Sequence, residues 1–339
     1  MPSDLPADQA NRTRTYTEGY QAYRRPCPAS PDQVPSVVVK QPLDCIRTDD
    51  RAAQNLNGGE ALPPTPGREV DASSGWNVWV DNNYTDISDR RYGFDLDGSS
   101  YGLTLGADRL LDNGLIVGGM LGMQNSRSKQ FDGDMQLKSN GYNLGPYVAY
   151  PYAENWVADA SVTFGQNNNE QRILMFSGDY TTTTWGFSLN NTGQFRYDDV
   201  YLRPRMSLYY GHTRSASYQM QGWLKDRQWV FDNDGSSANY GYVEFGSEFN
   251  RTFESDNGMR WMPYADVALK YEFERANDGM ILTGNLSYAE ASPWSGSTHA
   301  GVRMMWSNAT MLEASVGYES LGQGDLDIWS GRLYLSHGF

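Results

Sequence analysis

Three histidines are the side chains of this sequence best suited to acid–base or nucleophilic chemistry: His212, His299 and His337. His212 is the strongest candidate because Ser215 follows it closely, and a histidine that accepts a serine proton turns that serine into a nucleophile. The sequence places no acid to orient His212, and a histidine at the rim of a polar loop explains the pattern better. No H-E-x-x-H or phosphate-loop motif occurs. We therefore predict no catalytic site, with a hydrolase that uses His212 as the disfavoured alternative.

The chain has only two cysteines, Cys27 and Cys45, both near its N-terminus. In an otherwise cysteine-free exported chain, such a pair favours one disulfide, although the sequence leaves the bond itself open. There is no C-x-x-C motif and no neighbouring histidine, so a zinc site is not expected. We predict no metal and no cofactor.

The charged residues of the chain's second half follow a two-residue rhythm. In the segment 261–273 the odd positions run from Trp261 to Phe273 and are almost all apolar, whereas the even positions include Asp266 and Lys270. Successive side chains of a strand point to opposite faces, so one face is apolar and the other charged. A soluble sandwich would not pack a dozen such long strands around one core. The pattern therefore predicts an all-β transmembrane antiparallel barrel, with lipid outside and a polar lumen.

The rhythm starts near residue 76 and continues to the last residue. It gives thirteen candidate strands, and we exclude 281–291 as the arm of a loop hairpin because bacterial single-chain barrels have an even number of strands. The twelve remaining strands are predicted at 76–86, 99–111, 115–127, 138–150, 155–168, 181–195, 198–213, 238–254, 258–274, 296–307, 310–319 and 327–339.

The connections between these strands are predicted to alternate between short and long. Tight turns are expected at 112–114, 151–155, 256–258 and 307–308. Long polar loops are expected at 87–98, 128–137, 169–180, 214–237, 275–295 and 320–326. Short turns at one end and long loops at the other are typical of an outer-membrane barrel.

When the apolar residues of each strand are directed outward, a set of charged residues is directed into the lumen. It holds seven acids and five bases, so they can pair with one another and stiffen the barrel. The alternative is a hydrated path for a polypeptide threaded through the lumen. The predicted lumen-facing residues are Asp108, Asp159, Arg203, Arg205, Glu244, Glu248, Asp266, Lys270, Glu272, Arg303, Glu313 and Arg332.

Residues 1–75 differ in composition from the rest and are predicted to form a separate Pro-rich extension. They hold ten of the 15 prolines, and proline lacks the amide donor that a sheet requires. A short helix is possible at 49–56. The N-terminus has neither a basic start nor an apolar core, so we expect that any signal peptide has been removed. The net charge of -14 argues against nucleic acid and against docking on an anionic lipid surface.

The segment 101–123, YGLTLGADRLLDNGLIVGGMLGM, resembles the second and third strands of autotransporter β-domains (type V secretion). The segments 141–147, 262–266 and 332–339 are similar to later strands of that family, so the resemblance covers about 76–339. It implies a twelve-stranded barrel in the outer membrane of a Gram-negative bacterium. It also implies a segment before the first strand that lies partly in the lumen, and an upstream passenger that is carried to the cell surface.

The resemblance further implies assembly by the barrel assembly machinery and periplasmic chaperones. The machinery reads the last strand, where Leu333, Leu335 and the terminal Phe339 are expected to face the lipid. His337 stands where the family often has an aromatic residue. A translocator that exports or displays its N-terminal segment is therefore the favoured function. The alternative is a free-standing barrel that binds a partner as a structural or adhesin-like protein, through long loops such as 214–237 with Trp223 and Trp229.

Overall fold

The computed structural model describes residues 75–91, 95–197, 199–256, 258–276, 280–282, 288–307 and 310–339. The predicted helix at 49–56, Cys27, Cys45 and nearly all of the predicted extension lie outside these residues. Within them, β-strands dominate, and the 3-10 turn η3 (Phe131–Gly133) is short. No helix in the described part of the chain is long and apolar enough to cross a membrane.

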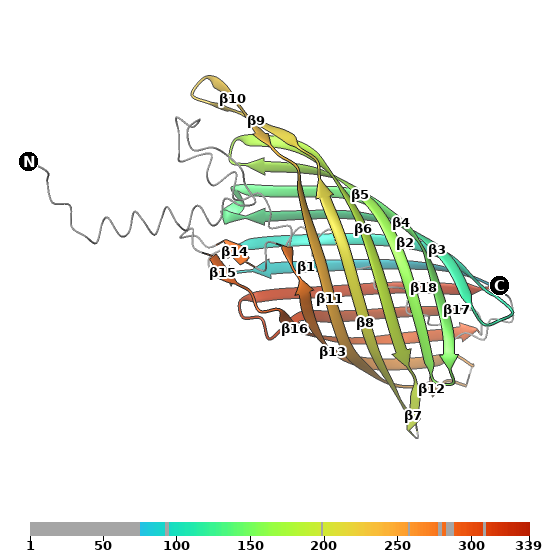
Figure 1. The fold of residues 1–339 in the computed structure, drawn as a ribbon. Helices are drawn as coiled ribbons and strands as arrows, with labels where there is room; N and C mark the ends of the chain where they lie inside the picture. Colours follow the sequence, from blue (N-terminus) through green and yellow to red (C-terminus); the bar gives the residue numbers. More distant parts are fainter. Residues whose placement is uncertain are drawn as a thin grey trace, which may run out of the picture.

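Twelve long antiparallel strands form the wall of the molecule (Figure 1). They contain 12 to 19 residues each, which is more than the roughly 9–11 residues that a tilted strand needs to cross a bilayer. These strands are β1 (Trp76–Asp89), β2 (Leu96–Leu110), β3 (Ile116–Gln130), β4 (Met135–Ala153), β5 (Trp156–Ile173), β6 (Phe176–Gly193), β8 (Val200–Ser215), β11 (Ser236–Arg251), β13 (Arg260–Glu274), β16 (Trp294–Ser307), β17 (Thr310–Leu321) and β18 (Leu326–Gly338).

Hydrogen bonding between neighbours closes this wall into a barrel. Each of the twelve strands pairs with the next one along the chain, including β6 with β8 across the inserted β7 (Phe195–Tyr197). The ring closes where β1 pairs with β18, with Val80 opposite Leu335. Closure removes the free edges that would otherwise expose backbone amides and carbonyls to lipid. The predicted twelve-stranded antiparallel barrel is confirmed.

The excluded segment 281–291 lies outside the barrel, as predicted. Its two short strands, β14 (Met280–Leu282) and β15 (Tyr288–Glu290), form a separate two-stranded sheet. A second hairpin, β9 (Tyr218–Leu224) and β10 (Arg227–Asn233), extends the sheet from the beginning of β6, where Ser177 pairs with Gln221. The short β12 (Phe253–Glu254) pairs with β13.

The structure tests the predicted lengths of the connections between strands. The turn at 112–114 is confirmed, because Gly114 has φ +82 and donates its N–H to the oxygen of Leu111 at 2.9 Å. The lengths predicted for the long loops are too large. Most of 169–180 is strand, since β5 ends at Ile173 and β6 begins at Phe176. Strands can continue past the apolar surface with polar residues on both faces, because their backbones still pair with those of neighbouring strands. Polarity alone was therefore a wrong reason to predict loops there.

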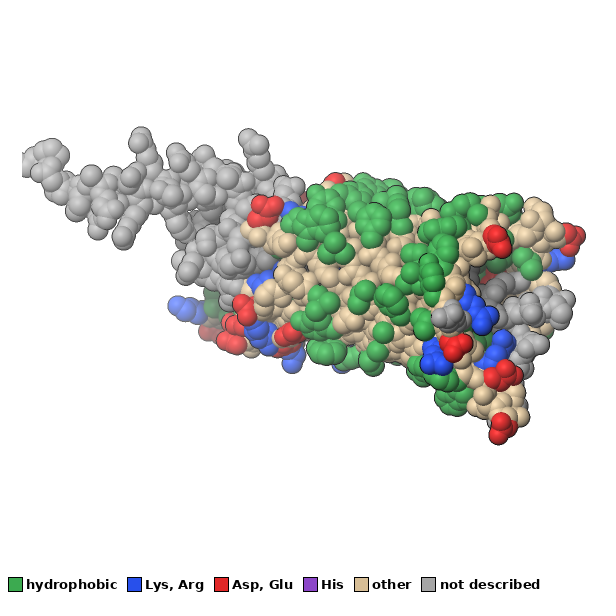
Figure 2. Space-filling view, turned by 90° about the horizontal axis from the view of Figure 1, so that it is seen from below, with side chains coloured by type: hydrophobic (Ala, Val, Ile, Leu, Met, Phe, Trp, Pro, Cys, Tyr) green, Lys and Arg blue, Asp and Glu red, His purple; other side chains and the backbone are tan. Residues whose placement is uncertain are grey.

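The outer surface carries the apolar half of the alternation. Leu105, Leu144, Val267 and Leu333 are all at least 45% exposed, although exposed hydrophobics on this scale are rare in soluble monomers. Figure 2 shows hydrophobic side chains over the middle of the visible face, with charged side chains toward its two ends.

Aromatic residues border the apolar surface at both ends, as expected where rings lie between lipid and water. At the end of the short turns these are Trp76, Tyr150, Tyr152, Trp261 and Phe339, and at the other end Tyr84, Tyr142, Trp294 and Trp329.

The inner side of the barrel has its own apolar cluster near the end of the short turns. The buried rings of Trp79 and Tyr147 meet there, and Trp79 Nε1 donates a hydrogen bond to the Tyr147 hydroxyl at 2.8 Å. Tyr147 in turn donates to Asp108 Oδ2 at 2.8 Å. A Cβ atom at Gly106 would lie 2.1 Å from the Trp79 ring, so only glycine leaves space for it. Gly118 is explained in the same way, because a Cβ atom there would lie 2.3 Å from the Tyr147 ring.

Candidate functional site

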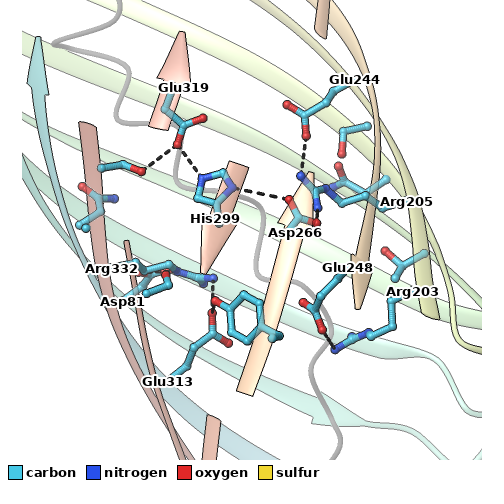
Figure 3. A pocket seen from close by; sticks show the side chains of 18 of the residues that line it. Asp81, Arg203, Arg205, Glu244, Glu248, Asp266, His299, Glu313, Glu319 and Arg332 are labelled. Atoms are coloured by element: carbon cyan, nitrogen blue, oxygen red, sulfur yellow. Dashed lines mark hydrogen bonds and ion pairs between the residues drawn. The ribbon is translucent and has the colours of Figure 1, made fainter. Parts of the chain in front are cut away.

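Charged side chains from opposite parts of the barrel line one internal cavity (Figure 3). The strands β1, β5, β6, β8, β11, β13, β16, β17 and β18 all contribute. The charged side chains of the cavity lie on the face of each strand opposite to the lipid-facing side chains, because successive side chains of a strand point to opposite faces. The charged and histidine residues of the lining are Asp81, Asp159, Arg203, Arg205, Glu244, Glu248, Asp266, Lys270, His299, Arg303, Glu313, Glu319 and Arg332.

Ten of the twelve residues predicted from the sequence line this cavity; Asp108 and Glu272 do not. Asp108 lies in the neighbouring aromatic cluster, where it accepts hydrogen bonds from Tyr147 and from Asn77. Glu272 accepts a hydrogen bond from the Tyr240 hydroxyl at 3.2 Å.

The first ion-pair network is centred on Arg303 of β16. Its Nη1 and Nη2 donate to both oxygens of Glu248 at 2.7 and 2.6 Å, and its Nε donates to Glu313 at 2.7 Å. Arg203 approaches Glu248 from the other side at 3.7 Å. The guanidinium lies 4.3 Å from the ring centre of Tyr264. A planar fork of donors that engages two carboxylates and a ring holds all of these groups in one geometry.

The network continues to the seam where the barrel closes. Arg332 of β18 donates from Nη2 to Asp81 Oδ2 of β1 at 2.6 Å and from Nε to both Asp81 oxygens at 3.0–3.1 Å. Arg332 also lies 3.5 Å from Glu313. One line of alternating charge thus runs from β8 to β1 and ties the first strand to the last.

The second network lies beside the first. Arg205 of β8 bonds to Glu244 at 3.0 Å and closely to Asp266. His299 lies between two carboxylates, with its Nε2 at 2.6 Å from Glu319 and its Nδ1 at 3.5 Å from Asp266. Figure 3 shows the imidazole directed at both acids. The imidazole ring is therefore held by a carboxylate at each of its two nitrogens, and neither of these two contacts is with a hydroxyl group.

Asp159 and Lys270 complete the charged lining of the cavity. Asp159 of β5 accepts from the Asn190 amide at 2.7 Å. Lys270 lies 5.5 Å from the ring centre of Tyr242.

Sequence reasoning missed Asp81, His299 and Glu319. The parity of the strands would have found two of them, because His299 lies four residues before Arg303 and Glu319 six residues after Glu313. Asp81 lies on the same face of β1 as Trp79, and an aromatic residue was expected to face the lipid. The Trp79 ring is buried inside the barrel, so the inward direction of Asp81 was missed.

The disfavoured pairing of His212 with Ser215 is contradicted by the structure. His212 Nδ1 contacts Asn239 Oδ1 at 2.7 Å, and its ring lies 6.2 Å from that of the exposed Trp185. Ser215 is buried and its hydroxyl contacts Thr182 at 3.3 Å. Residues three apart on a strand face opposite sides, so the histidine cannot reach this serine. In the described part of the chain, no cluster of His, Cys, Asp or Glu could hold a metal ion.

The last strand places its terminal residues as follows. Leu333, Leu335 and Phe339 are exposed on the outer face. His337 Nδ1 contacts the Thr310 hydroxyl at 2.8 Å, and its ring stacks on Phe339 with centres 6.3 Å apart.

A closed barrel with an apolar exterior and an ionised interior defines an outer-membrane β-barrel protein. The chain belongs to the autotransporter β-domain family, whose model matches residues 78–317. This family implies the outer membrane of a Gram-negative bacterium, and lipid contact follows from it.

Two solved domains of autotransporters share the fold. The chain is similar to the β domain of the Bordetella autotransporter BrkA, with a TM-score of 0.59 and 18% identity over 78% of this chain and 100% of that one. It is also similar to the translocator domain of NalP from Neisseria meningitidis, with a TM-score of 0.64 and 13% identity over 86% of this chain and 95% of that one.

Among curated proteins, the chain is similar to YaiT of Escherichia coli (strain K12), with 24% identity over 246 residues. It is also similar to outer membrane protein B of Rickettsia japonica, with 25% identity over 177 residues. These matches cover 68% and 46% of this chain, but only 24% and 10% of the two relatives. The chain thus spans a quarter or less of the curated relatives that it matches.

Proposed function

We propose that this barrel is a translocator that exports or displays its N-terminal segment at the cell surface. The observation that carries the proposal is the family match, which covers the barrel from β1 into β17. The two curated relatives are much longer than the matched region, which supports a domain that serves a larger polypeptide.

The lining of the cavity supports a polypeptide as the passing molecule. It carries both signs of charge, and most of its bases bond to acids of the same wall, as Arg303 and Arg332 do. A ring of one sign would select ions of the opposite sign, whereas a mixed, internally paired lining neither holds nor repels a chain of variable sequence. The proposal places part of residues 1–75 in this lumen.

The proposed partners follow from the same role. The barrel assembly machinery would bind the last strand, with Leu333, Leu335 and Phe339 on its lipid face and His337 at the penultimate aromatic position. Periplasmic chaperones would accompany the chain before insertion, and a disulfide between Cys27 and Cys45 would form there. Translocator domains of this family are transport barrels, and we propose that this one has no catalytic site of its own and no nucleic-acid partner.

An alternative function is favoured by one surface feature. Trp223 in the β9–β10 hairpin is 65% exposed, whereas Trp229 packs at the margin of the buried cluster around Phe176 and Met220. A tryptophan held outward at the tip of a hairpin suits recognition of a surface or envelope partner, as in a free-standing structural or adhesin-like barrel.

Surface exposure of the N-terminus separates the two functions. An epitope placed after residue 10 of the full chain, expressed behind a signal peptide, should react with antibody on intact cells if the segment is exported. As a control, an epitope in the turn at residue 113 should react only after the outer membrane is opened. An epitope at residue 10 that stays hidden on intact cells, with the barrel folded, contradicts the translocator proposal.

Occupation of the lumen can be measured by conductance. In planar bilayers, the full chain should conduct less than a chain that lacks residues 1–70, because a segment inside the lumen displaces electrolyte. Equal conductance of the two chains would show that the extension lies outside the lumen. Whether the segment is exported would then be decided by the epitope experiment alone.

A further inference from the structure

A cluster of basic side chains lies on the outer face of the barrel, on the neighbouring strands β3, β4 and β5. It consists of Arg127, Lys129, Lys138 and Arg172, all of which are exposed. Each shares the side of its strand with lipid-facing residues, such as Met123 on β3 and Leu144 on β4. The four bases gather on one face of a chain whose net charge is -14.

The strand register brings two of these bases directly side by side. Arg127 is the cross-strand partner of Lys138. The outer neighbours Lys129 and Arg172 both flank Gln136 of β4. Like charges directly opposite on adjacent strands destabilise a sheet unless a counter-charge lies near them.

The acidic residues nearby offset only part of this charge. Lys138 pairs with Glu170 at 3.2 Å, and Asp97, the cross-strand partner of Lys129, bonds to Arg90 at 2.7 Å. Among the described residues no ion pair is found for Arg127 or Lys129. On its other side Arg127 faces the neutral Ser99. A site for an anion is therefore left between β3 and β4.

The height of the cluster indicates which anion lies beside it. Below Arg127 and Lys138 on the same face lie Asn125 and Asn140, and below these Met123 and Tyr142 at the edge of the apolar surface. Four residues of strand span about 14 Å, or about 10 Å along the membrane normal for the usual tilt. Headgroups extend about 5–8 Å beyond the hydrocarbon, and long basic side chains bridge the remainder.

We propose that Arg127 and Lys138, assisted by Lys129 and Arg172, bind the phosphate group of an anionic lipid in the outer leaflet. The guanidinium of Arg127 donates to two phosphate oxygens, and the Lys138 ammonium adds a point charge. This site goes beyond export and rests on the proposed function only for its orientation, with the short turns toward the periplasm.

The test uses the purified full chain in zwitterionic micelles, titrated with short-chain phosphatidic acid. Short-chain phosphatidylcholine and inorganic phosphate are titrated in parallel. Binding is followed by native mass spectrometry, which counts the lipids that each barrel retains. Wild type should retain phosphatidic acid and bind the other two at least about tenfold more weakly.

The double variant Arg127→Gln/Lys138→Gln should bind phosphatidic acid about tenfold or more weakly, since two charge-assisted contacts are lost. Its matched control, Lys225→Gln/Arg227→Gln in the β9–β10 hairpin, removes the same charge from the same end of the barrel and should stay within about twofold. Lys129→Gln/Arg172→Gln provides a second, milder variant with an intermediate loss. Folding of every variant is verified by circular dichroism.

Unchanged binding in both cluster variants would overturn the site, as would equal losses in the hairpin control. Inorganic phosphate bound as tightly as phosphatidic acid would show an anion site that does not depend on lipid. None of these outcomes concerns the epitope experiment, so failure of the lipid site and failure of the translocator role are distinguishable.

Discussion

The two halves of the barrel's inner face are built differently. From β2 to β6 the buried polar residues are almost all neutral: Ser, Thr, Asn and Gln, with Asp108 and Asp159 as the charged exceptions. From β8 around to β1, a continuous series of ion pairs runs through charged residues of the inner face: Arg203, Glu248, Arg303, Glu313, Arg332 and Asp81. Both halves expose apolar side chains to the lipid, Leu105 and Leu144 in the first and Val267 and Leu333 in the second, so the difference does not come from the hydrocarbon of the membrane.

The comparison shows two ways to make the inside of a closed wall polar. In the neutral half, short side chains satisfy one another locally, as in the Ser161–Ser188 contact at 2.6 Å. In the ionised half, long side chains cross several strands, and each charge depends on its partners because an unpaired buried charge is very unfavourable. The ionised half should therefore be sensitive to single changes and the neutral half tolerant of them.

The largest effect is expected for Arg303→Met. The change leaves Glu248 and Glu313 without their main cation, and removing one partner of a buried pair costs about 3–5 kcal/mol. Urea unfolding in micelles measures the loss. The triple variant Arg303→Met/Glu248→Gln/Glu313→Gln should recover most of the stability. A single variant as stable as wild type would refute the contrast between the halves.

A smaller effect is expected for Gly106→Ala in the neutral half. The added Cβ would meet the Trp79 ring, which is fixed between Tyr147 and Tyr334, so overpacking should lower the unfolding free energy by about 1–3 kcal/mol. The matched control is Gly331→Ala in β18, where no heavy atom lies within 4 Å of the new Cβ. Equal losses in both variants would point to backbone propensity, and not to the ring contact.

The smallest effect is expected for Asp159→Asn. The amide oxygen introduced at position 159 can still accept the hydrogen bond that Asn190 donates. The unfolding free energy should therefore change by less than about 1 kcal/mol. The same replacement in the ionised half, Asp81→Asn, removes the charge opposite Arg332 and should cost about 2 kcal/mol. If the two variants were equally destabilised, the two halves would not differ in the way described.

Much of this architecture could be predicted from the sequence, because a two-residue alternation depends only on local strand geometry. It predicted twelve strands, the exclusion of 281–291 and the short turn at Gly114. It did not predict how far β5 and β6 continue past the membrane, or the β9–β10 hairpin. Polar residues are compatible with both strands and loops until neighbouring strands offer hydrogen bonds.

The candidate site divides in the same way. Parity selected the residues that line the cavity, and it would have selected His299 and Glu319 as well. It could not select partners: Glu248 lies 55 residues from Arg303, and Asp81 lies 251 residues from Arg332. The direction of each side chain is a local property of its strand, which the sequence by itself determined. The pairing of charges depends on the register and closure of the whole ring, which only the tertiary structure decided.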